Sequence, residues 1–242
     1  MMLLEGFNLS KNFGGIIAIK NFSFHINKGE IVGFIGPNGS GKTTLFNLIS
    51  GVLHPNAGIL KFKGEDITHL EPYEICKKGI SRTFQLVRPF LSHTVLENVL
   101  VGILFSNRNQ IDMESSTQEA MKLLEIVGLS EESNRITSKL PLLQRKRVEI
   151  ARALGTRSEL LLLDEPMAGL NHVEISDMIN LLKDIHSMMG ITICIIEHIM
   201  TAIMGMSNRI IVLHHGEKIA EGTPEELVQD KKVIQVYLGE CF

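Results

Sequence analysis

The chain has 242 residues, long enough for one large domain or two modest ones with a well-buried core. Its 24 basic and 27 acidic side chains leave a net charge of −3, which excludes a global positive field for nucleic acid or an anionic membrane. Because it has neither ~20 consecutive apolar residues nor a signal-peptide pattern at its start, we expect the protein to stay in the cytoplasm.

The first part of the chain predicts strands, a glycine-rich turn and a helix. The apolar runs at residues 21–26 and 30–36 are separated by the turn residues Lys28-Gly29, as in successive strands. After the glycine-rich turn, residues 42–53 have the spacing of an amphipathic helix. Its apolar face consists of Leu45, Leu48, Ile49 and Val52.

The glycine-rich turn has the sequence GPNGSGKT at residues 36–43 and matches the motif G-x-x-x-x-G-K-[ST] in full. Its glycines let consecutive backbone N–H groups point at a phosphate, and the following helix N-terminus adds positive charge. We expect Lys42 to reach the outer phosphates of ATP, Thr43 to bind Mg²⁺ and Thr44 to donate to a phosphate. The predicted ATP-binding residues of this turn are Gly36, Pro37, Asn38, Gly39, Ser40, Gly41, Lys42, Thr43 and Thr44.

Strand signals fade between residues 90 and 140, which predicts a mostly helical region. Residues 117–129 place four apolar side chains on one helical face before Gly128. The preceding polar stretch, residues 107–117, predicts a loop.

Continuous apolar strands alternate with helices in the remaining sequence, which indicates a parallel sheet covered on both faces. Four leucines at 160–163 precede Asp164 and Glu165, residues 173–190 predict a helix, and residues 191–198 form another apolar run ending at His198. Asp164 at the end of a buried strand can hold Mg²⁺ through its water shell. Glu165 is placed to polarise an attacking water. The alternative is that the two acids only end a strand before a turn.

These motifs in this order resemble the ATPase subunits of ABC transporters. The segments GPNGSGKTTLFNLISG, SRTFQLVRPFLSHTVLENVLVG, RVEIARAL, DEPMAGLN and VYLGE resemble the branched-chain amino acid importer ATPases in particular. The resemblance implies an α/β fold: a P-loop NTPase (RecA-like) core with a mainly parallel sheet, an N-terminal antiparallel β region and a helical subdomain. The whole chain, 1–242, would be one cassette, with residues 1–89 and 148–242 as the nucleotide-binding core and 90–147 as the helical subdomain.

Further site residues follow from the resemblance alone. Phe13 would stack on adenine, with a core phenylalanine in an N-terminal strand as the alternative. Gln85 would contact both Mg²⁺ and the attacking water, and His198 would touch the terminal phosphate and position water. A dimer loop, Gly169, Leu170 and Asn171, would cross the interface between two cassettes.

One segment departs from the family pattern. Residues 140–144, LPLLQ, occupy the signature segment, where the family has a serine or small residue and glycines that meet the ATP of the opposite subunit. Leu140 and Gln144 match, whereas Pro141, Leu142 and Leu143 do not. If Leu143 needed a positive φ, the strain would cost about 1–3 kcal/mol. A lost phosphate contact would add roughly 1.5–3 kcal/mol, together about 10²–10⁴ in closure or turnover at the partner's site.

The resemblance implies the ATP-binding and hydrolysing subunit of an importer for branched-chain or related amino acids, with ATP and Mg²⁺ as cofactors. It implies a head-to-tail dimer with a second ATPase subunit, as a heterodimer or a homodimer. Membrane-spanning permease subunits would bind the chain, a substrate-binding protein would act on it indirectly, and nucleic acid is not expected. The chain would lie peripherally on the inner face of the cell membrane. Phe90, Leu91 and Val95 would line the groove that receives a permease segment, or would belong to the subdomain core.

Two other functions remain open at this point. The degenerate signature segment favours a regulatory or structural cassette that binds ATP with weak turnover, whereas Glu165 and His198 argue against it. A soluble ABC ATPase acting on ribosomes or DNA is the third possibility, against which stand the single cassette and the mild negative charge.

Overall fold

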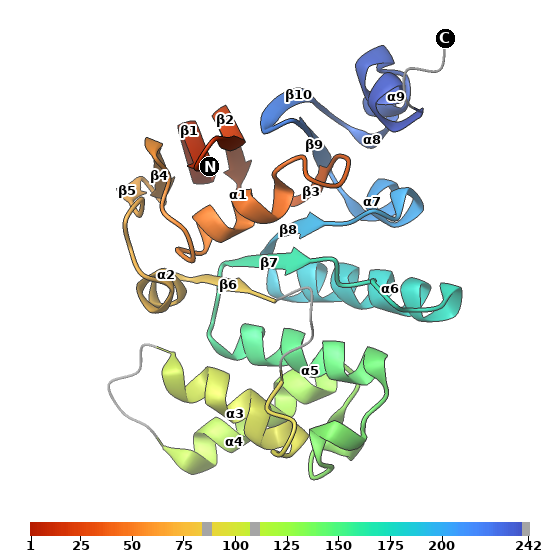
Figure 1. The fold of residues 1–242 in the computed structure, drawn as a ribbon. Coiled ribbons are helices and arrows are strands. Elements are labelled where there is room, and N and C mark those ends of the chain that lie inside the picture. The colour runs from red at the N-terminus through yellow and green to blue at the C-terminus, as the bar shows by residue number, and fades with distance from the viewer. Residues whose placement is uncertain (84–88, 107–111, 239–242) are drawn as a thin grey trace.

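The computed structural model describes residues 1–83, 89–106 and 112–238 (Figure 1). Gln85 lies outside the described residues. Within the described ranges, every helix is too short or too polar to cross a bilayer. The elements form two sheets and a group of helices, and the group α3–α5 lies apart from the N-terminal strands in Figure 1.

The N-terminal sheet is antiparallel, with the strand order β2-β1-β4-β5. Its strands are β1 (Met2–Phe13), β2 (Ile16–Asn27), β4 (Ala57–Phe62) and β5 (Glu65–Asp66). A hairpin turn joins β1 to β2, where Gly14 has a φ of 57° that glycine adopts at little cost. The predicted antiparallel β region is therefore confirmed.

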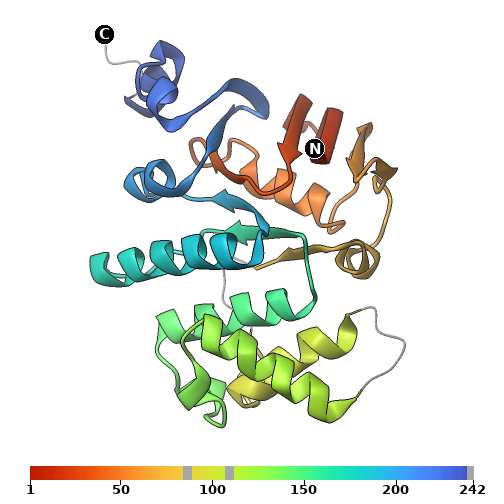
Figure 2. The ribbon, with the colours of Figure 1, turned by 180° about the vertical axis from the view of Figure 1, so that it is seen from behind.

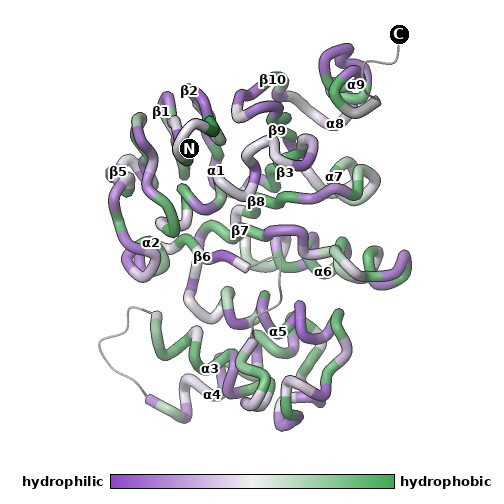
Figure 3. The backbone as a smooth tube through the Cα atoms, in the orientation of Figure 1, coloured by the Kyte–Doolittle hydropathy of each residue, from purple (hydrophilic) through white to green (hydrophobic). Residues whose placement is uncertain are grey.

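The second sheet has six strands in the order β10-β9-β3-β8-β7-β6. All neighbours pair in parallel except β9 and β10, which form an antiparallel hairpin. The strands are β3 (Ile31–Ile35), β6 (Ile80–Arg82), β7 (Leu160–Asp164), β8 (Thr192–Ile196), β9 (Arg209–His214) and β10 (Glu217–Gly222). Every residue of β3, β7 and β8 is buried, which explains their continuous apolar sequences, and β8 is mostly green in Figure 3.

Two hydrophobic clusters cover the two faces of this sheet, because successive side chains of each strand point in opposite directions. Leu160 and Leu162 pack toward α1 (Lys42–Ile49) and the N-terminal sheet. Leu161 and Leu163 pack toward the other face, where α6 (His172–Met189) contributes Leu182 and Ile185. From behind, α6 lies along this face (Figure 2). The remaining helices of the core are α2 (Pro72–Lys78), α7 (Met200–Met206), α8 (Pro224–Val228) and α9 (Lys231–Leu238).

The predicted helical region contains α3 (Val95–Phe105), α4 (Met113–Ile126) and the start of α5 (Leu142–Gly155), with short 3₁₀ turns between α4 and α5. The loop predicted over residues 107–117 was wrong from Met113 onward. Asp112 caps α4 by accepting hydrogen bonds from the N–H groups of Glu114 and Ser115, so a polar first turn is helical. The helix α5 crosses residue 147, and the division of the cassette there stays a prediction.

Candidate functional site

The phosphate loop connects β3 to α1 and depends on its glycines. Gly36, Gly39 and Gly41 have φ angles of 152°, 79° and 107°, in the range that favours glycine. A Cβ atom on Gly36 would lie 2.1 Å from the carbonyl oxygen of Leu213, and one on Gly41 would lie 2.5 Å from that of Ala18. The backbone of this loop is therefore pressed against two neighbouring strands, and a side chain at either glycine would displace it.

Lys42 is folded back onto the loop. Its Nζ donates to the carbonyl oxygens of Gly36 at 2.7 Å and Pro37 at 2.9 Å, and the side chain is 5% exposed. Burial lowers the pKa of Lys42, while the nearby carboxylates of Glu165 and Asp164 oppose that shift. An ammonium group held by two carbonyl oxygens can exchange them for the oxygens of a phosphate, which bind a cation more strongly.

Asp164 ends β7 and is 2% exposed. One carboxylate oxygen, Oδ2, accepts a hydrogen bond from Arg82 Nη2 at 2.8 Å. The other, Oδ1, is buried and has no hydrogen-bond partner among the residues that the structure describes. Burial raises the pKa of Asp164, and Arg82 opposes the shift. A buried oxygen without a donor fits a hydrated Mg²⁺ ion, because the ion's water would satisfy it.

The side chains of Glu165 and His198 form a pair beyond the carboxyl ends of β7 and β8. Glu165 Oε1 and His198 Nε2 are 3.0 Å apart, and the side chains are 17% and 40% exposed. Glu165 has a φ of 49°, unusual for a residue with a side chain, and its N–H donates to the carbonyl oxygen of Ile196. A backbone of this kind costs about 1–3 kcal/mol, and such strain gathers at functional sites.

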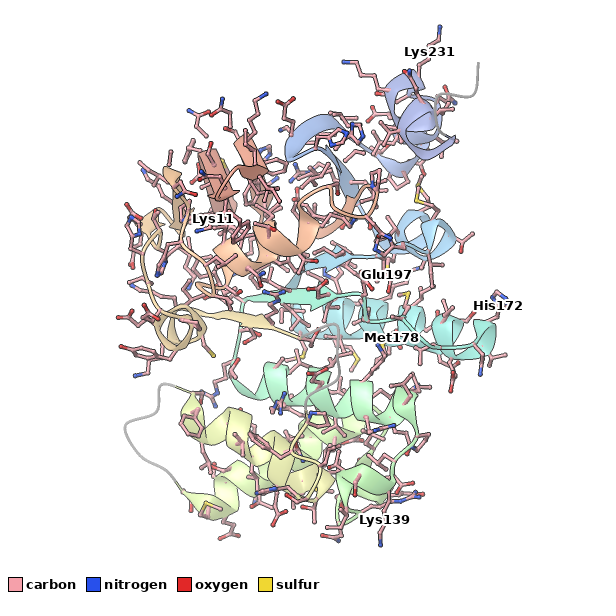
Figure 4. The ribbon with its side chains drawn as sticks, viewed as in Figure 1. Lys11, Lys139, His172, Met178, Glu197 and Lys231 are labelled. Carbon is pink, nitrogen blue, oxygen red and sulfur yellow. The ribbon has the colours of Figure 1, made fainter. Side chains whose placement is uncertain are left out.

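Glu197, labelled in Figure 4, is a residue of this site that the sequence did not reveal. It is 2% exposed and accepts hydrogen bonds from the N–H groups of Met167 at 2.7 Å and His198 at 3.0 Å. Burial raises its pKa against these hydrogen bonds. Glu197 thus ties the turn after Glu165 to the turn that carries His198. The only sequence signal was a carboxylate directly after a fully apolar strand.

The phosphate loop, Asp164, Glu165 and His198 meet because the three strands that carry them are neighbours. The order β3-β8-β7 places their carboxyl ends side by side, where ligands bind in open α/β sheets. Phe13 ends β1 with 47% exposure, outside both hydrophobic clusters, so it is not a core phenylalanine. Lys11 Nζ lies 5.5 Å from the centre of its ring.

The signature segment opens α5 without the strain that the sequence suggested. Pro141 is the N-cap, and Leu142 and Leu143 lie in the first helical turn. Neither leucine has a positive φ, so the condition under which Leu143 would be strained is not met: the first turn of an ordinary helix accepts a leucine. Leu140 is buried, and Gln144 Oε1 is buried without a hydrogen-bond partner in the described part of the chain.

The dimer loop lies against the signature segment of the same chain. A Cβ atom on Gly169, whose φ is 79°, would lie 3.1 Å from a methyl group of Leu142. Leu143 and Leu170 are partly buried against the same hydrophobic cluster. Asn171 caps α6, and its side chain accepts from the N–H groups at positions 173 and 174. The unusual leucines therefore fill space beside the dimer loop.

A groove of about 410 Å³ separates the helical region from the core. Phe90 and Phe105 line it from the helical region, and Val52 and Ile75 line it from the core. The prediction for Phe90 agrees with its place in the groove wall. Val95 is fully buried in the core cluster instead.

Comparisons with known proteins identify relatives over nearly the whole length. The family model described as ABC transporter matches residues 19–168, and the model described as branched-chain amino acid ATP-binding cassette transporter matches residues 217–240. The chain is 38% identical over 251 residues to the high-affinity branched-chain amino acid transport ATP-binding protein BraF of Pseudomonas aeruginosa, covering 99% of this chain and 98% of the relative. The corresponding LivG protein of Escherichia coli K12 gives the same identity and coverage.

Solved structures agree with these relatives. A nucleotide-free ATP-binding cassette from an ABC transporter superposes with a TM-score of 0.88 at 35% identity, covering 99% of this chain and 100% of that one. The ADP conformation of an ATP-binding cassette superposes with a TM-score of 0.89 at 36% identity and the same coverage. The P-loop NTPase fold is thereby confirmed.

Proposed function

The chain belongs to the ABC transporter family of ATP-binding cassettes and is an ATPase, and from this we propose that it energises an importer of branched-chain or related amino acids. The observation that carries the proposal is the full-length similarity to transport proteins of that class, together with the C-terminal match at residues 217–240. The alternative of a regulatory cassette has no comparable support, because the side chains of Glu165 and His198 are paired 3.0 Å apart, as hydrolysis would need.

In this proposal, ATP binds to the phosphate loop, residues 36–44, with adenine against Phe13. Lys42 exchanges the carbonyl oxygens of Gly36 and Pro37 for phosphate oxygens. The half-exposed ring of Phe13 offers a flat apolar face to adenine, and its place at the end of β1 leaves that face accessible. These contacts would bind and orient the nucleotide.

Thr43, Asp164 and Gln85 would hold Mg²⁺, which neutralises phosphate charge when bound. The buried Oδ1 of Asp164 supports this assignment, because it accepts no hydrogen bond from any residue that the structure describes. Glu165 would orient the attacking water and accept its proton. His198, whose Nε2 lies 3.0 Å from Glu165 Oε1, would fix that carboxylate and contact the terminal phosphate. The hydrogen bonds of Glu197 would hold the turn after Glu165 against the turn that carries His198, and would therefore fix the positions of these two side chains relative to each other.

We infer a head-to-tail dimer in which ATP lies between the phosphate loop of one subunit and the signature segment of the other. A solved cassette with a TM-score of 0.82 and 29% identity is described as a dimer bound to ADP and phosphate. In our chain, Pro141 lacks both an N–H and a hydroxyl group, and the leucines cover the first turn of α5. A lost phosphate contact of roughly 1.5–3 kcal/mol corresponds to about 10- to 100-fold at the partner's site.

This asymmetry favours a heterodimer, in which one site keeps an intact signature from a different ATPase subunit. Permease subunits in the membrane would dock in the groove lined by Phe90 and Phe105. The chain would then lie on the inner face of the cell membrane. A substrate-binding protein would act only through the permease. No role for nucleic acid follows from a net charge of −3.

Uptake by proteoliposomes tests the proposed cargo. The chain is reconstituted with the permease subunits, the second ATPase and the binding protein encoded beside it, and ATP-dependent accumulation of labelled leucine, isoleucine, valine and glutamine is compared. We expect leucine, isoleucine and valine to accumulate strongly and glutamine to accumulate weakly. Accumulation of a different class of solute, with ATP hydrolysis intact, would overturn the cargo assignment and leave the ATPase assignment standing.

A further inference from the structure

Arg82 is a buried arginine at the end of β6 with 6% of its side chain exposed. Its guanidinium donates from Nη2 to Asp164 Oδ2 at 2.8 Å. From Nη1 it donates to Asn47 Oδ1 at 2.6 Å and to Ser50 Oγ at 3.1 Å. The guanidinium also lies 5.9 Å from the ring centre of Phe46. This one side chain therefore binds two different elements of the nucleotide-binding core.

A charged side chain in such a place is not explained by stability. Removing a guanidinium from water costs several kcal/mol, and a buried ion pair often contributes no more than well-packed apolar residues of similar size. The contacts of Arg82 have a geometric consequence instead. The guanidinium is a planar fork with donors in fixed directions, so it sets the orientation of each acceptor that it binds.

For Asp164 the consequence is that its two oxygens differ. Arg82 occupies Oδ2, while Oδ1 is buried and has no hydrogen-bond partner within the described ranges of the chain. A carboxylate held by one oxygen cannot rotate without breaking that bond. Oδ1 is thereby left as the acceptor for the water shell of a cation.

The other contacts of Arg82 lie on the helix that presents Thr43. Asn47 and Ser50 belong to the end of α1 and its C-cap, and α1 begins at Lys42. The third predicted magnesium contact, Gln85, follows Arg82 by three residues and lies outside the described residues. The guanidinium thus joins the elements that carry Thr43 and Asp164.

We propose that Arg82 is a positioning residue of the magnesium site, which holds Asp164 with Oδ1 toward the ion and fixes its distance from Thr43. The inference rests on the proposed nucleotide site, in which Thr43 and Asp164 hold the ion. It does not make Arg82 a ligand, since a cationic side chain does not bind a metal ion. Its effect passes through Asp164 and α1.

The test uses the purified full-length chain and the variant Arg82→Lys, which keeps the charge and loses the fork. Affinity for a fluorescent ATP analogue is measured with Mg²⁺ and with a chelator, and the Mg²⁺ concentration that gives half of the binding enhancement is determined. We expect Arg82→Lys to raise that concentration about tenfold, equivalent to about 1.4 kcal/mol. Affinity in the chelator should stay within about twofold of the unaltered chain, because the phosphate loop does not depend on Arg82.

Arg209→Lys is the matched control. Arg209 is another largely buried arginine, it binds Glu30 at 2.8 Å, and it begins β9, which lies next to the edge strand β10 on the other side of the same sheet. It should leave the Mg²⁺ dependence unchanged. Asn47→Ala, which removes one acceptor of Arg82 without unpairing a buried charge, should shift the Mg²⁺ dependence in the same direction by a smaller factor of about two to three. This milder variant keeps the test decisive if Arg82→Lys unfolds.

A double-mutant cycle separates positioning from general stabilisation. In an Asp164→Asn background, Arg82→Lys should cause a much smaller further change in Mg²⁺ dependence, because the path through Asp164 is already lost and only the path through α1 remains. Equal losses of affinity with Mg²⁺ and with the chelator, or additive effects in the cycle, would overturn the positioning role. If the unaltered chain itself binds the nucleotide without any Mg²⁺ dependence, the proposed nucleotide site fails rather than Arg82 alone.

Discussion

At the scale of single residues, the pair formed by Glu165 and His198 carries the proposed chemistry. Glu165 is held in a strained backbone conformation with a φ of 49°, and its carboxylate lies 3.0 Å from the imidazole. Glu197 accepts hydrogen bonds from the N–H groups of Met167 and His198, and so holds the turn after Glu165 against the turn that carries His198. The geometry therefore leaves little freedom in where a water between Glu165 and a terminal phosphate could lie.

We predict that His198→Ala lowers ATP turnover on the order of 10²- to 10³-fold with little change in ATP affinity, because the imidazole orients the base without holding the loop. Phosphate release and equilibrium nucleotide binding measure the two quantities separately. His172→Ala is a suitable control, since His172 lies at the start of α6 (Figure 4). Turnover within threefold of the unaltered chain would contradict the role given to His198.

Glu30 gives a prediction for stability against pH. Burial raises the pKa of Glu30, but hydrogen bonds from Arg209 and Asn27 outweigh it and lower the pKa from its ordinary value of 4.5. A carboxyl group whose pKa is lowered in the folded state stabilises the protein at any pH above its pKa in the unfolded state. This stabilisation is lost as the pH falls through its pKa in the folded state. Glu30→Gln should therefore lower the free energy of unfolding by about 1.5–3 kcal/mol at pH 7.

The difference between Glu30→Gln and the unaltered chain should shrink as the pH falls below 4.5 and through the lowered pKa of folded Glu30, because the protonated carboxyl is then as neutral as the glutamine. Urea denaturation of both chains at pH 7 and at acidic pH measures this difference in the free energy of unfolding, with the exposed Glu131→Gln as the control. A difference that is the same at both pH values would show that the ion pair with Arg209 is not its source.

At the scale of elements, the ends of helices were the features that the composition of the sequence predicted least well. The helix α4 begins at Met113 because Asp112 caps it, although the preceding polar composition indicated a loop. Asp112→Ala should lower the free energy of unfolding by about 1 kcal/mol, whereas Asp112→Asn should stay within about 0.5 kcal/mol, since the amide also caps a helix. Urea denaturation of both variants measures the difference. Equal losses for the two variants would contradict the cap.

The first turn of α5 yields the prediction for the signature segment. Pro141→Ser with Leu142→Gly returns an N–H, a hydroxyl group and open space beside Gly169, while Leu143 keeps its packing. ATP turnover by the heterodimer should rise about 10- to 100-fold at the weak site, because one phosphate contact is restored. Pro141→Ala is the control, since it restores only the N–H. Unchanged turnover with the partner present would mean that these residues limit nothing.

At the scale of the whole molecule, the sequence predicted what is local in the chain. The phosphate loop, the strand before Asp164 and the helix after it follow from spacing over a few residues, and the buried parallel strands follow from their continuous apolar sequences. Resemblance supplied the rest of the cassette, and the structural relatives confirm its fold.

Contacts between distant segments could not be predicted from the sequence. Arg82 and Asp164 are 82 positions apart and meet only because β6 and β7 are neighbours in the sheet. Glu197 reaches Met167 across 30 positions for the same reason. The sequence could not decide whether Leu143 needs a positive φ, because a glycine in a motif does not by itself require one, and the structure shows that Leu143 does not have one. Such features depend on tertiary packing, which no local pattern contains.

The central claim is that this chain hydrolyses ATP with Glu165 and that hydrolysis drives import. The most direct measurement is the rate of ATP hydrolysis by the reconstituted transporter that contains Glu165→Gln in this chain, with nucleotide affinity determined on the same preparation. We expect a loss of at least about 100-fold at the site of this chain, with affinity for ATP unchanged within about threefold. Hydrolysis at that site within a few-fold of the unaltered rate would contradict it.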